Sequence, residues 1–169
     1  MIVVDSNVLA ARMLSCESTD LALSVEAADS VWLVPRLWRY EFLNILATQI
    51  KAGRVKQPAA NAMWQRLASL LEVNESDPAA EQVLELVAKH RITAYDAHFV
   101  ALARVNACLM VTEDAELQRK FPDLAVSMQS FVSSKGHSGW VRELSETYGK
   151  RKKSNHPNRK MRCLASAGF

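Results

Sequence analysis

The run Ile2-Val3-Val4-Asp5-Ser6-Asn7-Val8-Leu9 begins with three consecutive apolar residues and then reaches an acidic one. Consecutive β-branched residues are typical of a strand that is buried on both faces of a sheet. Ser6 is a suitable N-cap for a helix over residues 7–13. A strand that leads directly into a helix predicts the start of an α/β fold. Asp5 would then lie at the carboxyl end of the strand, where open parallel sheets bind their ligands.

The chain continues this alternation of strands and helices. Asp77-Pro78 supplies an N-cap and a first-turn proline for one helix, and Thr93 supplies an N-cap for the next. The alternation predicts a central parallel sheet with helices on both faces. Further strands are expected at residues 31–34, 108–112 and 124–126, and further helices at residues 19–28, 36–51, 57–71, 77–89, 93–106 and 114–120.

Four acidic residues occupy positions that do not favour stability. Asp5 ends the first strand, and Asp114 follows the apolar run 109–112 by two residues. Glu41 interrupts the apolar stripe of a predicted helix, and Asp96 opens another apolar helix. A buried carboxylate destabilises the fold or shifts its pKa unless a cation or strong donors compensate it. A strand-end turn or an N-cap explains any one of them, but all four together, with no equally placed Lys or Arg, indicate a shared divalent metal.

The same positions carry short motifs that resemble the PIN domain and, more narrowly, the VapC-type toxins of bacterial toxin–antitoxin pairs. The resemblance covers residues 1–132 and implies a three-layer α/β/α fold and a Mg²⁺- or Mn²⁺-dependent endoribonuclease. Its acidic quartet of catalytic residues and metal ligands maps onto Asp5, Glu41, Asp96 and Asp114. The motifs are Asp5-Ser6-Asn7-Val8-Leu9, Val34-Pro35 with Trp38-Arg39-Tyr40-Glu41, Ala94-Tyr95-Asp96-Ala97 and Val111-Thr112-Glu113-Asp114.

The residue types agree with that chemistry. Carboxylate oxygens suit Mg²⁺ or Mn²⁺, and such a cation can activate water for attack on a phosphodiester. Thr112 precedes Asp114 by two residues, so in an extended segment both side chains face one way. The resemblance favours Thr112 as a supporting residue that orients a carboxylate or a water, with strand termination as the alternative. Ser6 or Asn7 is a weaker candidate for the same role beside Asp5, although helix capping explains Ser6 equally well.

Two other classes of protein fit part of the pattern. One is a non-catalytic RNA-binding or regulatory module that keeps the PIN fold, against which the four intact acids argue. The other is a Mg²⁺-dependent small-molecule phosphohydrolase, because such enzymes also present an acid after an N-terminal strand. In that class a second acid donates a proton, and Asn7 cannot do so.

The charge of the chain is unevenly distributed. Residues 133–169 contain nine Lys and Arg against two Glu, a net +7, whereas residues 1–132 contain 12 Lys and Arg against 16 Asp and Glu, a net −4. We therefore expect a PIN-like nuclease domain over residues 1–132 and a basic, flexible C-terminal tail over residues 133–169. A solvated extension and a segment that binds RNA phosphates both fit such a tail.

The setting and the partners follow from composition and from the resemblance. No apolar run approaches the roughly 18–20 residues that a membrane-spanning helix needs. Cys16, Cys108 and Cys163 are odd in number, far apart and without C-x-x-C spacing, which favours a reducing, cytoplasmic setting. The resemblance implies an RNA substrate, a small cognate antitoxin and a homodimer, with no membrane association.

Overall fold

The structure, a computed structural model, describes residues 1–135, so residues 136–169 of the predicted tail lie outside the described part. Its centre is a four-stranded parallel sheet with the strand order β2-β1-β3-β4. Val3 of β1 pairs with Leu33 of β2 on one side and with Met110 of β3 on the other. The strands are β1 (Ile2–Val4), β2 (Trp32–Leu33), β3 (Met110–Val111) and β4 (Ala125–Val126).

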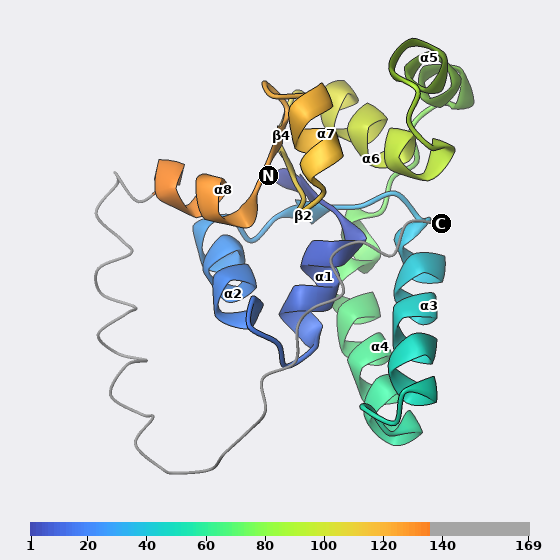
Figure 1. Cartoon of the computed structure of the whole chain (residues 1–169), viewed down its shortest axis with the longest axis vertical. Helices are drawn as coiled ribbons and strands as arrows, with labels where there is room; N and C mark the ends of the chain where they lie inside the picture. Colours follow the sequence, from blue (N-terminus) through green and yellow to red (C-terminus); the bar gives the residue numbers. More distant parts are fainter. Residues whose placement is uncertain (136–169) are drawn as a thin grey trace.

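Helices cover both faces of the sheet, which confirms the three-layer α/β/α prediction (Figure 1). One layer contains α1 (Ser6–Met13), α2 (Thr19–Ala28), α3 (Trp38–Lys51), α4 (Gln57–Leu71) and α8 (Met128–Lys135). The other contains α5 (Ala80–His90), α6 (Ala94–Val105) and α7 (Ala115–Lys120). A short 3₁₀ helix, η1 (Glu72–Asn74), follows α4.

The alternating side chains of β1 separate two hydrophobic cores. Ile2 and Val4 pack into the core formed with α1–α4 and α8, whereas Val3 packs into the core formed with α5–α7. Each of the three is at most 2% exposed, as expected for a central strand buried on both faces. Because all the strands are parallel, the carboxyl ends of β1 and β3 lie at the same edge, where Asp5 N donates to Val111 O at 3.0 Å.

The start of α5 differs from the prediction. The helix begins at Ala80, and Ala79 N donates to Gln82 Oε1 at 3.3 Å. Asp77 was expected to cap this helix, and that prediction is wrong. Its Oδ1 accepts instead from Arg36 N at 2.8 Å, so the carboxylate fixes the segment before α5 against the segment before α3. The edge of β2 is covered in the same region, where Val34 pairs with Glu75.

Helix α8 was not predicted, and it runs through the boundary expected after residue 132. Met128 and Phe131, each 1% exposed, pack it into the core beside α2. Ser127 Oγ accepts from Ser130 N at 3.0 Å and so caps its first turn. Across residues 1–135, no helix is long and apolar enough to cross a membrane.

Candidate active site

Asp5 is held at the end of β1 by three neutral donors. Its Oδ1 accepts from Ser6 N at 2.6 Å, so Asp5 itself caps α1, and Ser6, the expected cap, is the first helical residue. Its Oδ2 accepts from Thr112 Oγ1 at 2.6 Å and from Asn7 Nδ2 at 2.7 Å. A carboxylate has no donor of its own, so donors from α1 and from the residue that follows β3 fix its orientation.

Thr112 joins the ends of β1 and β3. It is fully buried, and its Oγ1 accepts from Asn7 Nδ2 at 3.1 Å and from Asp114 N at 3.0 Å while donating to Asp5. Asn7 Oδ1 accepts in turn from Glu113 N at 3.2 Å. Thr112 was expected to orient a carboxylate, and the one that it contacts is that of Asp5. Asn7, a weaker candidate from the sequence, completes this network.

Glu41 reaches the same region from the first turn of α3. Ser6 Oγ donates a hydrogen bond to Glu41 Oε2, which connects α1 to α3. Ser6 is 6% exposed, so this hydroxyl is one of the few buried polar groups in the described chain. The sequence suggested Ser6 as a helix cap or as a group beside Asp5; the structure places its side chain on Glu41.

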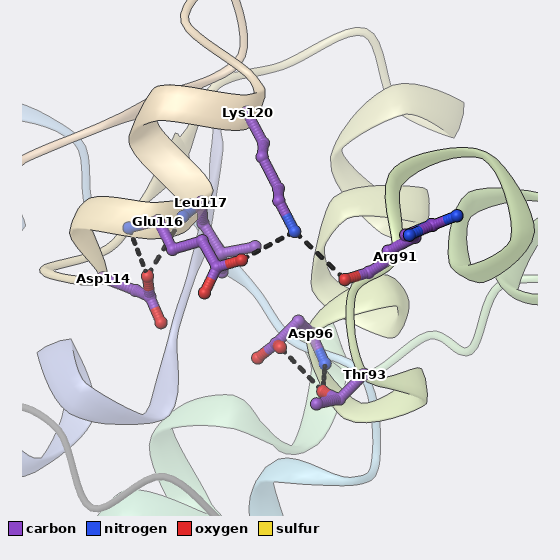
Figure 2. Close-up of polar contacts among 7 residues, drawn as sticks. All are labelled: Arg91, Thr93, Asp96, Asp114, Glu116, Leu117 and Lys120. Atoms are coloured by element: carbon purple, nitrogen blue, oxygen red, sulfur yellow. Dashed lines mark hydrogen bonds and ion pairs between the residues drawn. The ribbon is translucent and has the colours of Figure 1, made fainter.

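Asp96 and Asp114 extend from the N-terminal ends of α6 and α7 into the same space (Figure 2). Asp96 Oδ2 accepts from Thr93 Oγ1 at 2.7 Å, and Thr93 also caps α6 as predicted. Asp114 Oδ1 accepts from the backbone N–H groups of Glu116 and Leu117 at 2.7 and 3.0 Å. Both carboxylates therefore lie where the helix dipole favours negative charge.

Burial and mutual repulsion shift two of the four carboxyls. Burial raises the pKa of Asp5 to about 6; the bonds from Thr112 and Ser6 lower it, and nearby Asp96 and Asp114 raise it. Burial likewise raises the pKa of Glu41 to about 7; the bond from Ser6 lowers it, and Asp5 and Asp96 raise it. The charges of Asp5, Glu41, Asp96 and Asp114 thus act on one another within one region.

No positive side chain of residues 1–135 neutralises this group of acids. The Lys, Arg and N-terminal ion pairs of that part of the chain all engage other carboxylates: Glu26, Asp29, Glu75, Asp77 and Glu116. Each of Glu41 Oε1, Asp96 Oδ1 and Asp114 Oδ2 also accepts no hydrogen bond from the described residues. These oxygens remain available for a ligand that carries positive charge.

The donor set fits Mg²⁺ or Mn²⁺, although it is not a closed cage. Among residues 1–135, no three His, Cys, Asp or Glu side chains are placed to hold a metal ion unaided. Mg²⁺ keeps several waters and takes one or two protein carboxylates, so it does not require such a cage. Mutual repulsion also separates carboxylates that a cation would draw together. Asp5, Asp96, Asp114 and Glu41 are the residues that would hold it.

Other polar and aromatic candidates lie outside the network. His98 Nδ1 lies 2.6 Å from Ala94 O in its own helix. Trp38 is fully buried, and its ring centroid lies 5.3 Å from that of Trp64. Trp38 Nε1 donates to Glu75 Oε1 at 2.8 Å. These contacts give Trp38 a structural role in the core.

A family model described as the PIN domain matches residues 2–121, which include all four acids and Thr112. The chain belongs to the PIN domain family. The resemblance stated from the sequence motifs is therefore confirmed, and so is the fold that it implied.

Two relatives of the chain are named as VapC proteins. The chain is 30% identical over 127 residues to Ribonuclease VapC3 of Pyrobaculum aerophilum, covering 73% of this chain and 96% of that protein. It is 33% identical over 81 residues to Exonuclease VapC9 of the same organism, covering 48% of this chain and 60% of that protein. The crystal structure of PAE2754 from Pyrobaculum aerophilum superposes with a TM-score of 0.64 at 23% identity, covering 81% and 97% of the two chains. That similarity supports the fold.

Proposed function

We propose that this PIN-domain protein is a Mg²⁺- or Mn²⁺-dependent endoribonuclease that hydrolyses RNA phosphodiester bonds, and that it is the toxin of a toxin–antitoxin pair. The observation that carries the proposal is the group of four carboxylates without a neutralising Lys or Arg at one edge of the sheet. The names of the VapC relatives support nuclease activity, one as a ribonuclease and one as an exonuclease.

The site residues have different proposed roles. Asp5 and Asp96 would hold the cation directly, and Asp114 and Glu41 would contact it through water. Thr112 positions Asp5 through its 2.6 Å hydrogen bond and keeps that carboxyl ionised by lowering its pKa. When bound, the cation favours deprotonation of a water and neutralises charge on the phosphate oxygens. No side chain of the network is placed as a separate nucleophile, so direct hydrolysis by water is the proposed mechanism.

A circular RNA tests the proposal, because only an endonuclease can cut a strand that has no ends. Purified protein should linearise the circle with Mg²⁺ or Mn²⁺ and leave it intact with EDTA. Asp5→Asn should be inactive in the same assay. Degradation of linear RNA alone would indicate an exonuclease, and binding without cleavage would indicate the non-catalytic module. Turnover of a small phosphate ester, with RNA left intact, would indicate the phosphohydrolase.

We also propose that the protein forms a cytoplasmic homodimer and binds a small antitoxin. Helix α3 carries an exposed apolar stripe of Tyr40, Leu43 and Ile50, which are 74%, 46% and 38% exposed. A second copy of the chain would bury such a stripe.

An antitoxin arginine could pair with the carboxylates bidentately and displace the cation. Light scattering of the purified protein tests the dimer. Expression of the chain alone should arrest growth, and co-expression of the protein encoded next to it should relieve the arrest, which tests the toxin–antitoxin pair.

A further inference from the structure

A group of cationic side chains lies beside the acidic site, at the ends of α5 and α7. Lys120 Nζ, in the last turn of α7, donates to Arg91 O at 3.0 Å and lies 2.6 Å from Glu116 Oε1. Figure 2 shows this ammonium group bordering the space into which Asp96 and Asp114 extend. Arg91 follows α5 directly and precedes the turn that leads to Thr93 and Asp96. The Lys120 ammonium and the backbone of Arg91 therefore border the space that holds these carboxylates.

Further basic side chains of this region pack against the ring of Phe121. Its ring lies 4.7 Å from the ring of His90 and 5.4 Å from Arg104 Cζ. The pKa of His90 is lowered by desolvation and then by the charges of Arg104, Lys89 and Lys120. Those charges act on one imidazole, so the ends of α5, α6 and α7 bring their cations together. We name Lys89, Arg91, Arg104, Arg119 and Lys120 the α5–α7 cationic surface.

Most of this positive charge is uncompensated. Lys89, Arg91, Arg104 and Arg119 are exposed and form no ion pair with any residue in the described range 1–135. The acidic residues within the same stretches, 89–91, 104 and 116–123, are Glu116 and Asp123. Five cations against two acids leave a formal charge of +3 there, although residues 1–132 as a whole carry −4.

The helix dipoles account for only part of this excess of positive charge. Cations in the last turns of α5, α6 and α7 complement the negative ends of the helix dipoles. Each helix end carries about half an elementary charge, so three ends offset roughly 1.5 charges. About half of the local positive charge is left without an internal partner. An anionic ligand has the chemistry to complement this remaining charge.

We propose that the α5–α7 cationic surface binds the phosphate backbone of RNA and guides the strand to the acidic site. The proposal rests on the nuclease function proposed above. Four carboxylates repel a polyanion, so a substrate needs cations close to the point at which it is cut. This surface supplies them on the side of Asp96 and Asp114. Binding of this kind is independent of sequence and sensitive to salt.

A matched pair of charge-removing variants tests the surface. Lys89→Gln/Arg91→Gln/Arg119→Gln removes three exposed cations of the surface and leaves the bridging Lys120 intact. Lys51→Gln/Arg54→Gln/Lys56→Gln removes three exposed cations at the turn between α3 and α4, away from α5 and α7 (Figure 1). Both variants keep the full chain and lose the same charge. A difference between their RNA affinities therefore depends on where the removed cations lie. Their melting temperatures establish that both are folded.

The measurement is the affinity of each protein for a fluorescent single-stranded RNA in EDTA, titrated with salt. If all three cations contact phosphates, the surface variant loses about two units of log–log salt slope, since each contact contributes roughly 0.7. The control variant should keep the wild-type slope. With Mg²⁺, the surface variant should show a raised KM and an unchanged kcat. Equal slopes for the two variants would overturn the proposal.

The outcomes separate this proposal from the nuclease proposal. If the wild-type protein cleaves RNA and the surface variant keeps its slope and KM, the surface proposal fails and the nuclease proposal stands. If the wild-type protein does not cleave RNA but the surface variant alone loses affinity, the nuclease proposal fails and the binding surface stands.

Discussion

The hydroxyl of Thr112 and the carboxylate of Asp5 are joined by a 2.6 Å hydrogen bond across 107 positions of sequence. Thr112 is fully buried, and burial is the main cause of the raised pKa of Asp5. A donated hydrogen bond favours the ionised form of a carboxyl, which is the form that binds a cation. This contact therefore opposes the effect of burial at the centre of the proposed site.

Replacing Thr112 with Val should raise the pKa of Asp5 above its value of about 6, because the bond that lowers it is lost and the shape is kept. The pH profile of kcat/KM should then shift to higher pH on its acidic side. Thr112→Ser keeps the hydroxyl and should restore the wild-type profile. A profile that does not move in Thr112→Val would show that Thr112 only terminates its strand.

The metal-free protein should lose stability as the pH rises. The folded-state pKa values of Asp5 and Glu41, about 6 and about 7, lie above the ordinary values of 3.8 and 4.5. Between these limits the folded chain holds protons that the unfolded chain has released, so the free energy of unfolding declines with pH. Chemical denaturation in EDTA from about pH 5 to about pH 8 measures this decline.

Mg²⁺ or Mn²⁺ should reverse that loss. A cation bound only by the folded state stabilises it by mass action, and it competes with protons for the same oxygens. The rise in melting temperature on adding Mg²⁺ should therefore be larger at about pH 8 than at about pH 5.5. Asp96→Asn should reduce the rise, whereas the exposed Asp123→Asn serves as a control. A rise that does not depend on pH would contradict binding at the raised-pKa carboxyls.

Strand and helix periodicity predicted most of the fold because the signals are local. The unbroken apolar run of β1 predicted a strand buried on both faces, and the side chains of Ile2 and Val3 do enter opposite cores. Asp77 does not cap α5, because its carboxylate accepts a hydrogen bond from the backbone N–H of Arg36. That contact spans 41 positions, so no local sequence pattern predicts it. Helix α8 was missed because its serines and β-branched Val132 have low helix propensity, whereas Met128 and Phe131 pack it into the core.

The difference between local signals and long-range contacts also applies to the candidate site. The four acids were identifiable because each lies within or beside an apolar run of its own strand or helix. The donors that hold them were harder to assign, since Ser6 Oγ contacts Glu41 across 35 positions and Asn7 contacts Thr112 across 105. The signal for Ser6 and Asn7 was their place directly after Asp5, which fits helix capping equally well.

Removing residues 136–169 should weaken RNA binding if the basic tail contacts phosphates. The cut belongs after Lys135, because α8 extends to that residue and an earlier end would remove part of a helix. Beyond Lys135 the chain has eight Lys and Arg against two Glu, so loss of those contacts should also reduce the salt dependence. Salt titration of RNA affinity, beside the full chain, measures the change. An unaltered slope would identify the tail as a solvated extension.

Asp5→Asn should abolish metal-dependent RNA cleavage and, at about pH 8, stabilise the metal-free protein. The asparagine oxygen can still accept from Ser6 N or Thr112, while the buried charge and its repulsion by Asp96 and Asp114 are removed. A gain on the order of 1 kcal/mol would raise the melting temperature by about 2–4 °C for a chain of this size. Asp123→Asn, which removes an exposed charge, should change neither property. Full cleavage by a nuclease-free preparation of Asp5→Asn would exclude the proposed mechanism.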